Sequence, residues 1–269
     1  MMVVNLAQGG AAASVLTGLY NIPLHVVDVG AEPYPAPVPA EHVSCSKVDV
    51  GGTVGNLRDT DAMDAEALTR SLRAGADTVD RLPDGTDLLI LGEMGIGNTT
   101  PAAAMAAHLL NCPAAEMVGP GTGVSGDALA AKTRLVSDAL VRTRGTVAPV
   151  DVLRRLGGRE IAAIVGAMGR AAERGIAVLV DGFIVSSAAL VAVRMDERLR
   201  DYFWFGHRSA EPGHARILQA MDAAPLVDAG LRLGEGSGAL TAWPLVQAAV
   251  ALHNEMATFE QASVPDRED

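Results

Sequence analysis

Aromatic residues, cysteines and basic residues are all scarce in this chain of 269 residues, and each scarcity narrows the class of protein. Hydrophobic residues make up 49% of the chain, but Phe, Trp and Tyr make up only 3%. Alanine, valine, leucine and glycine must therefore fill most of the core. Small side chains let helices lie close to a sheet, which favours a layered α/β fold. The net charge of −11 argues against nucleic acid or an anionic membrane as a partner.

Features of secretion, membrane insertion and metal binding are lacking as well. Cys45 and Cys112 form no metal-ligand spacing, which indicates a reducing, cytoplasmic compartment. No Lys or Arg precedes Lys47, so the charged start of a signal or transit peptide is missing. No uninterrupted run of 18 apolar residues occurs, so we expect no membrane span. The histidines show no paired spacing, and no metal site is expected.

Short apolar runs alternate with helical patterns along the chain, which predicts an α/β fold with a mainly parallel sheet and helices on both faces. The prolines between 33 and 39 indicate an extended connector, and the tail after Gln261 is predicted to be frayed. Residues 1–20 are predicted to form one helix despite Gly9 and Gly10. Strands are expected at 24–29, 86–91, 176–180 and 202–205, and an apolar stretch lies at 226–233. Helices are expected at 62–82, 102–110, 127–141, 159–174, 183–193, 215–221 and 238–256.

The stretch GEMGIGNTT at 92–100 lies between a predicted buried strand and a predicted helix. Thr99 or Thr100 would cap that helix, and Pro101 suits its first turn. Glycines and a helix start together expose backbone N–H groups to an anion, so the carboxylate of Glu93 in their midst suggests a catalytic or orienting acid. A triphosphate-binding loop would need lysine where Asn98 stands. A tight turn whose glycines serve packing alone is the other interpretation.

A second glycine-rich loop at 121–126 matches G-x-G-x-x-G, but no clear strand precedes it. An anion-facing loop followed by a helix that carries Lys132 is therefore favoured over a dinucleotide fingerprint. Glu93, Asp181, the loop of Ser209 and Glu235 all follow predicted strands. Because the carboxyl ends of parallel strands share one edge of the sheet, we expect these residues to form a single site.

Six motifs in order resemble the nicotinate-nucleotide:dimethylbenzimidazole phosphoribosyltransferase family. They are GEMGIGNTT at 92–100, GTG at 121–123, GGREI at 157–161, DGFI at 181–184, GHRSAEPGH at 206–214 and GEGSG at 234–238. The resemblance runs from Met1 to about Phe259. It implies transfer of the phosphoribosyl group of nicotinate mononucleotide to dimethylbenzimidazole, which gives α-ribazole 5′-phosphate and nicotinate during cobalamin synthesis.

The resemblance assigns roles to particular residues. Glu235 is the implied general base, because the pyridinium leaving group is already cationic while the attacking benzimidazole must lose a proton. Glu93 is the implied second carboxylate, near the ribose and the attacking ring. Glu235 could instead serve a helix dipole, and Asp181 could be a strand-end cap. The residues implied to bind substrate are Gly95, Gly97, Asn98, Thr99, Gly121, Thr122, Gly123, Lys132, Asp181, Phe183, Ser209 and Gly238.

The resemblance also implies a homodimer that needs no metal or organic cofactor. A Rossmann-like catalytic domain is expected over 21–237 and a small helical domain from 1–20 and 238–262, with 263–269 as a frayed tail. Family members begin upstream of Met1, so we expect an incomplete small domain and acceptor pocket. Pro120 stands where the family usually has arginine. Two alternatives stay open: a truncated nucleotide-binding paralogue without turnover, and a base-exchange or phosphorolytic transferase with a smaller acceptor.

Overall fold

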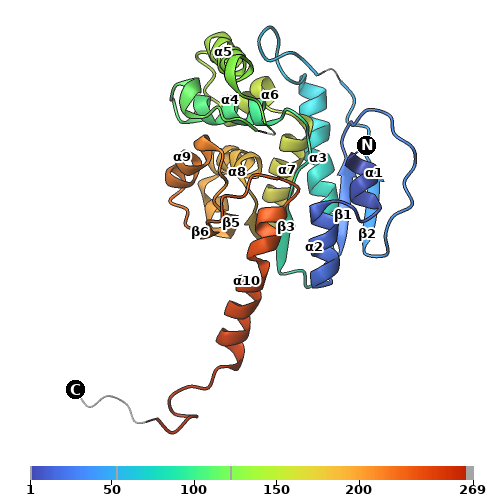
Figure 1. Ribbon diagram of the computed structural model, residues 1–269, viewed down its shortest axis with the longest axis vertical. Coiled ribbons are helices and arrows are strands. Elements are labelled where there is room, and N and C mark those ends of the chain that lie inside the picture. Colours follow the sequence, from blue (N-terminus) through green and yellow to red (C-terminus); the bar gives the residue numbers. More distant parts are fainter. Residues whose placement is uncertain (1, 53, 122, 265–269) are drawn as a thin grey trace, which may run out of the picture.

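The computed structural model describes residues 2–52, 54–121 and 123–264 (Figure 1). Strands and helices alternate through the middle of the chain, as the sequence predicts. The strands are β1 (Leu24–Asp28), β2 (Val43–Lys47), β3 (Leu88–Leu91), β4 (Ala177–Val180), β5 (Phe203–His207) and β6 (Pro225–Val227). The helices are α1 (Met2–Ala7), α2 (Ala12–Tyr20), α3 (Ala65–Asp80), α4 (Thr99–Leu109), α5 (Gly126–Arg142), α6 (Pro149–Leu156), α7 (Arg159–Glu173), α8 (Phe183–Met195), α9 (Pro212–Ala220) and α10 (Ser237–Glu255), with 3-10 helices η1 (Ala114–Glu116) and η2 (Glu197–Tyr202).

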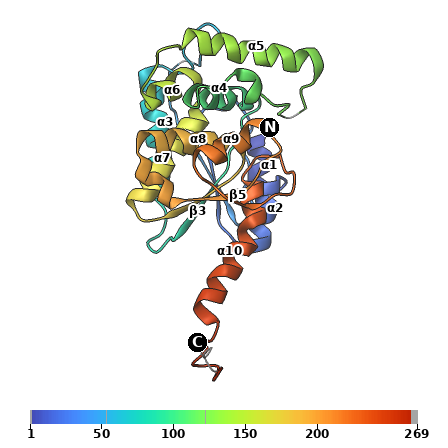
Figure 2. The same cartoon turned by 90° about the vertical axis from the view of Figure 1, so that its left-hand side faces the viewer.

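A parallel sheet with the strand order β3-β4-β5-β6 forms the centre of the molecule. Each strand lies beside the strand that precedes it in the chain, so every crossover steps in the same direction. Because such crossovers are right-handed almost without exception, the helices between the strands fall on one face of the sheet. The other face is left for the ends of the chain, and α10 lies there beside α2 (Figures 1 and 2).

Both faces of the sheet are covered, which confirms the predicted fold class. On one face Val178 and Phe205 join a large buried core with residues of α4, α7 and α8. On the other face Leu179 packs with Ala239 and Val246 of α10. Alternate residues of a strand point to opposite faces, so a central strand that is apolar throughout needs a helix on each side.

Small residues set the spacing between α3 and α7. A Cβ atom added to Gly75 would lie 1.7 Å from the carbonyl oxygen of Ala163, and one added to Gly166 would lie 1.9 Å from that of Leu72. The two helix backbones are therefore in direct contact. This agrees with the expectation that alanine and glycine, rather than aromatic rings, fill the interior.

The prediction of one helix over residues 1–20 is wrong. α1 ends at Ala7, and the chain turns at Gly9, which has a φ of +87°. α2 starts three residues after Gly9. By length and composition alone, 2–20 with a mean hydropathy of 1.3 is apolar enough to cross a membrane. A core helix or a signal sequence passes the same test, so this segment does not define a membrane span.

Several element boundaries differ from the predictions. No strand was predicted at β2 and no helix at α6. α4 includes Thr99 and Thr100, so the N-cap is Asn98 instead of a threonine. α9 starts at Pro212, earlier than expected. Of the expected tail, Ser263 and Val264 end a turn with backbone bonds to residues 259–260, and the remainder lies outside the described residues.

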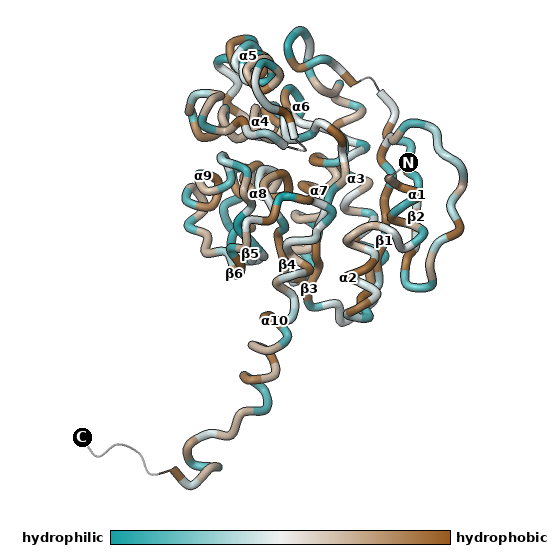
Figure 3. Tube along the Cα trace, viewed as in Figure 1, coloured by the Kyte–Doolittle hydropathy of each residue, from teal (hydrophilic) through white to brown (hydrophobic). Residues whose placement is uncertain are grey.

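The second half of α10 projects away from the body of the molecule (Figures 1 and 2). Apolar residues, coloured brown, recur along this projecting part between pale and hydrophilic ones (Figure 3). Leu252 is 60% exposed and Met256 is 71% exposed. The first half of the helix, by contrast, is buried between the sheet and α2, where Leu240 packs with Leu6 and Ala13. The N-terminal helices and the first half of α10 thus meet in space, as the expected small domain requires, although the division into two domains stays a prediction.

Candidate active site

The two loops that carry the predicted acids lie side by side at the carboxyl edge of the sheet. Residues 92–98 follow β3, and the loop of Glu235 leads from β6 into α10. The backbone N–H of Glu235 donates to the carbonyl oxygen of Glu93 at 3.0 Å. A Cβ atom on Gly92 would lie 2.4 Å from the nitrogen of Gly236, so the loops touch through their backbones. The sheet edge therefore brings together two acids that are distant in sequence.

Glu93 belongs to an acidic cluster that is bridged by Asn98. Nδ2 of Asn98 donates to Oε2 of Glu93 at 2.5 Å and to Oε1 of Glu160 at 3.3 Å. Burial is the main reason why the pKa of Glu93 rises from 4.5 to about 7. The hydrogen bond from Asn98 lowers that pKa, while the negative charges of Asp181 and Glu160 raise it further. Glu93 therefore gains or loses its proton near neutral pH.

Glu235 lies in a turn of left-handed backbone. The φ angles of Gly234, Glu235 and Gly236 are +86°, +64° and +78°. The left-handed region costs a residue with a Cβ atom roughly 1–2 kcal/mol, so the surroundings must hold Glu235 in place. Its Oε2 accepts from the backbone N–H of Ala13 at 3.3 Å, in the first turn of α2. This bond links the turn of Glu235 to the start of α2.

Asp181 binds the backbone of α10 at its start. Its Oδ2 accepts from the N–H of Gly236 at 3.2 Å, and its Oδ1 accepts from the N–H of Ala239 at 3.0 Å. Nε2 of His207 lies 3.5 Å from the same Oδ1. Gly238 is needed here for space, because a Cβ atom would lie 1.9 Å from the ring of His207. Asp181 and Gly238, both predicted to bind substrate, thus shape the turn that carries Glu235.

Lys132 lies at the second glycine-rich loop. Its Nζ donates to Oγ1 of Thr99 at 2.7 Å and to the carbonyl oxygen of Gly119 at 2.8 Å. An ammonium group has three N–H donors, so these bonds occupy two of them. Oε1 of Glu211 accepts from the N–H of Gly121 at 2.9 Å and fixes the loop. Burial lowers the pKa of Lys132, and the charge of Glu211 works against that effect.

The other predicted glycines divide into open and crowded positions. A Cβ atom on Gly97 or Gly123 would meet nothing within 4 Å, so their backbones border open space. A Cβ atom on Gly95 would lie 2.7 Å from Nδ2 of Asn98, so Gly95 makes room for the amide that bridges the acids. Thr122 lies outside the described residues.

Phe183 and Ser209 are buried. Phe183 is 3% exposed and packs in the core, and its assignment to substrate binding stays a prediction. The N–H of Ser209 donates to Nδ1 of His214 at 2.8 Å, and its hydroxyl accepts from the N–H of Glu211 at 3.3 Å. Nε2 of His214 lies 2.9 Å from Oγ of Ser186. Burial is the main reason why the pKa of His214 falls to about 3, so this ring is neutral near pH 7.

Sequence reasoning missed three participants in the site. The GGREI segment was quoted only as a motif of the resemblance, yet Glu160 in the first turn of α7 shares the amide of Asn98 with Glu93. Glu211 was part of a motif but was given no role. Ala13 was expected only as helix. No local signal pointed to the contact of Glu160, because Arg159 separates this acid from Gly157 and Gly158, whereas two glycines flank Glu235 directly.

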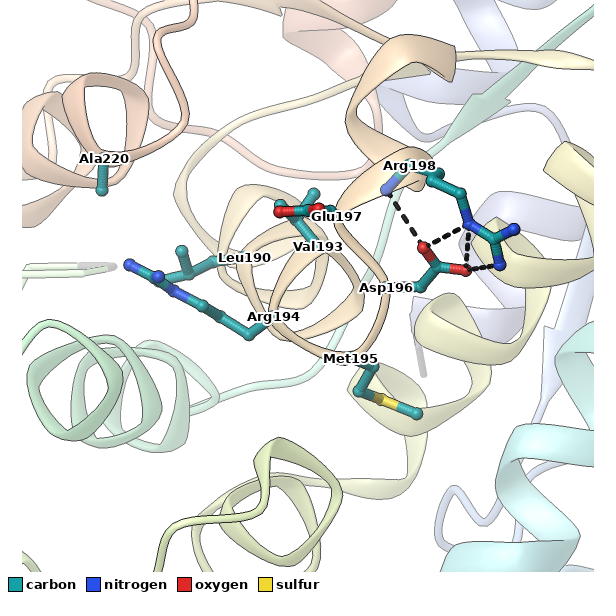
Figure 4. Close-up of a pocket in the computed structure, with 8 residues that line it drawn as sticks. All are labelled: Leu190, Val193, Arg194, Met195, Asp196, Glu197, Arg198 and Ala220. Atoms are coloured by element: carbon teal, nitrogen blue, oxygen red, sulfur yellow. Dashed lines mark hydrogen bonds and ion pairs between the residues drawn. The ribbon is translucent and has the colours of Figure 1, made fainter.

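A pocket of about 670 Å³ lies elsewhere in the molecule, at the end of α8 (Figure 4). Leu190, Val193, Asp196 and Arg198 are among the residues that line it. Asp196 and Arg198 form an ion pair with one another (Figure 4). The lining includes none of the acids or glycines of the sheet edge, so this pocket is separate from the candidate active site.

The fold and the site define the class of protein. A parallel sheet whose carboxyl edge carries glycine-rich turns is typical of α/β proteins that bind nucleotides, and here acids and the half-buried Lys132 lie at that edge. A family profile described as phosphoribosyltransferase matches residues 1–264. The chain belongs to this family and is a transferase that moves phosphoribosyl groups.

Similar proteins agree on a more specific name. The nicotinate-nucleotide--dimethylbenzimidazole phosphoribosyltransferase of Ectopseudomonas mendocina is 49% identical over 269 residues, which cover 99% of this chain and 75% of the relative. The protein of that name from Azotobacter vinelandii is also 49% identical, over 98% of this chain and 75% of the relative. The crystal structure of CobT from Thermus thermophilus matches with a TM-score of 0.90 and 40% identity, covering 99% of this chain and 79% of that one.

Proposed function

We propose that this chain transfers the phosphoribosyl group of nicotinate mononucleotide to dimethylbenzimidazole in the synthesis of the lower ligand of cobalamin. The products are α-ribazole 5′-phosphate and nicotinate. The observation that carries this proposal is the direct contact between the loops of Glu93 and Glu235 in a chain that matches relatives of this name along almost its whole length. Both acids lie at the edge of a parallel sheet, where nucleotides bind.

The reaction needs a base and no acid. One benzimidazole nitrogen attacks the anomeric carbon, and the bond from that carbon to the pyridinium nitrogen breaks with inversion. The leaving nicotinate takes the bonding electrons and becomes neutral at nitrogen without a proton. The other benzimidazole nitrogen gives its proton to the carboxylate of Glu235, which acts as the general base. Its bond to the N–H of Ala13 orients the carboxylate for this step.

The remaining groups suit the nucleotide. Lys132 uses two of its donors on the protein, which leaves a cationic donor for the phosphate. The open backbones at Gly97 and Gly123 let a ligand approach closely. In its ionised form Glu93 places negative charge beside a donor whose ring is cationic and whose ribosyl carbon gains positive charge as the glycosidic bond breaks. No cofactor takes part in this scheme.

The test is product formation by the purified chain from nicotinate mononucleotide and dimethylbenzimidazole, followed by liquid chromatography and mass spectrometry. We expect α-ribazole 5′-phosphate and nicotinate in equal amounts. Nucleotide binding without product at any protein concentration would reject the enzyme and favour the binding paralogue. Release of nicotinate that requires inorganic phosphate or a smaller base would favour the other transferase reaction.

Substitution of the base separates chemistry from binding. Glu235→Gln should lower kcat by about 10²- to 10⁴-fold, because general-base catalysis contributes about that much. KM for nicotinate mononucleotide should change less than about threefold, since the base acts mainly on the other substrate. Glu173→Gln, on the exposed side of α7, is the matched control and should leave kcat unchanged. Unchanged kcat in Glu235→Gln would remove this residue as the base.

The proposed assembly is a homodimer. A projecting helix with a row of exposed apolar side chains indicates a surface that binds a partner. Along α10 the side chains of Leu245, Val250 and Leu252 are each more than half exposed. A second copy offers the same apolar surface and can cover the first by two-fold symmetry. Light scattering coupled to size-exclusion chromatography should give twice the chain mass of 27.7 kDa, and a monomer at micromolar concentration would contradict the dimer.

The proposed compartment is the cytoplasm. Cys45 and Cys112 are both free thiols, and Cys45 is exposed, as suits a reducing environment. Cell fractionation with an antibody to the chain should find it with cytoplasmic markers, and recovery with the membrane or an exported fraction would contradict the assignment.

A further inference from the structure

The turn that carries Glu235 is held against its own conformational preference. Gly234 and Gly236 adopt positive φ without steric cost, but Glu235 between them, with a φ of +64°, must be held there by its surroundings. One contact comes from the carbonyl oxygen of Glu93, which accepts the N–H of Glu235. The other contacts come from Asp181, which accepts the N–H groups of Gly236 and Ala239 on either side of the helix start.

The surroundings of Asp181 suit a residue that fixes the backbone of α10 rather than one that binds a ligand. It is 2% exposed, and each of its oxygens already accepts a backbone N–H from α10. His207 closes the remaining side, with Nε2 at 3.5 Å from Oδ1. A carboxylate gives charge-assisted hydrogen bonds, which are roughly twice as strong as those of a neutral acceptor. Rigid β4 thus fixes the first turn of α10 through one side chain.

We propose that Asp181 is a positioning residue for the general base: by binding the N–H groups of Gly236 and Ala239 it holds Glu235 at the distance from the acceptor base that proton transfer requires. This inference rests on the proposed function and goes beyond it, because the residue had been expected to bind the nucleotide. Glu235 approaches the substrate, and Asp181 acts only through the backbone that follows Glu235.

Asp181→Asn is the primary test, because asparagine keeps the size but replaces one acceptor oxygen with an NH₂ group. The NH₂ group faces a backbone N–H, so one of the two bonds is lost. Displacement of a catalytic group by about 1 Å costs about 10²-fold in rate, and kcat should fall by about that factor. KM for nicotinate mononucleotide should change less than about threefold. An increase of tenfold or more in KM with little change in kcat would overturn the proposal and return Asp181 to nucleotide binding.

A double-mutant cycle shows whether Asp181 acts through Glu235. In the Glu235→Gln background no base remains to be positioned, so Asp181→Asn should cost less than about threefold in kcat. An equal loss in both backgrounds would overturn the proposal. Asp28→Asn is the matched control, because Asp28 is also a buried aspartate at the end of a strand, as the last residue of β1, and accepts the N–H groups of Gly30 and Ala31. It should lower stability without the loss in kcat.

Hydrogen exchange gives a readout that does not depend on turnover. In Asp181→Asn the amides of residues 234–240 should exchange at least about tenfold faster, while Asp28→Asn leaves them unchanged. Unchanged exchange there in Asp181→Asn would overturn the proposal even if the chain proved to have another substrate. Absence of product from the unmodified protein would instead reject the proposed function alone. If Asp181→Asn does not fold, Asp181→Ser, which keeps one small acceptor, replaces it in the same measurements.

Discussion

Glu93 should destabilise the protein at alkaline pH, and Glu93→Gln should therefore make it more stable there. Burial raises the pKa of this carboxyl group from 4.5 to about 7. In the folded protein Glu93 therefore either keeps its proton or carries a negative charge that its buried surroundings disfavour. Glutamine keeps the shape and can still accept from Asn98, but it carries no charge at any pH.

The sign and size of the effect follow from proton linkage. Between pH 4.5 and about 7 the folded protein holds a proton on Glu93 that the unfolded chain has released, so stability falls as pH rises. At 1.36 kcal/mol for each pKa unit, this loss reaches roughly 3 kcal/mol above pH 7 and is roughly 1 kcal/mol at pH 5. Glu93→Gln should remove it. The variant should gain roughly 2 kcal/mol more at pH 8 than at pH 5.

Urea unfolding of the unmodified protein and of Glu93→Gln at pH 5 and pH 8, followed by circular dichroism, measures this difference. Glu173→Gln serves as the control, and its exposed side chain should shift the free energy of unfolding by less than about 0.5 kcal/mol at both pH values. Equal destabilisation by Glu93→Gln at both pH values would refute the reasoning, because it would mean that the charge carries no folding cost.

Three further perturbations test other parts of the structure. Burial opposes ionisation of Asp61, but hydrogen bonds from three arginines of α5 and α6 lower its pKa to about 2; Asp61→Asn should therefore cost roughly 2 kcal/mol in urea unfolding at pH 7, a difference that fades as pH falls from 3.8 toward 2. Gly75→Ala should lower the free energy of unfolding by about 2 kcal/mol or more because its Cβ atom meets the backbone of α7, whereas Gly169→Ala, with open space around it, should raise that free energy by about 0.5–1 kcal/mol. Equal effects in thermal unfolding would contradict the close packing of α3 and α7. Lys132→Met should raise KM for nicotinate mononucleotide at least about tenfold through loss of a charge-assisted bond to phosphate, and an unchanged KM in steady-state kinetics would remove Lys132 from that role.

The fold could be predicted from the sequence because its signals are local. Runs such as 176–180 are apolar over the length of one strand, and each is followed by a helical pattern, so the parallel sheet and its covered faces follow directly. β2 gave no such signal, because its residues 43–47 alternate serine with cysteine, valine and lysine at an exposed edge. The break at Gly9 was visible, but a surrounding apolar stretch outweighed it in the prediction.

The site could be predicted only as far as the sheet edge. The strand ends placed Glu93 and Glu235 at the same edge, and the structure brings their loops into contact. Which groups face each other across that edge depends on tertiary packing. Asp181 follows a strand, as a ligand-binding residue would, but the start of α10 takes both of its oxygens. Glu160 reaches Asn98 from α7, and no local pattern records such a contact.

The topology has a consequence for the order in which the protein is made. Synthesis runs from the N-terminus, so the sheet strands are complete before α10 exists. Until that helix docks, Asp181 is an aspartate without its two backbone donors, and Leu179 lacks its apolar cover. A nascent or proteolysed chain that ends before Ser237 therefore leaves one face of the sheet without its helix. Chains with exposed apolar surface of this kind are substrates of cellular quality control.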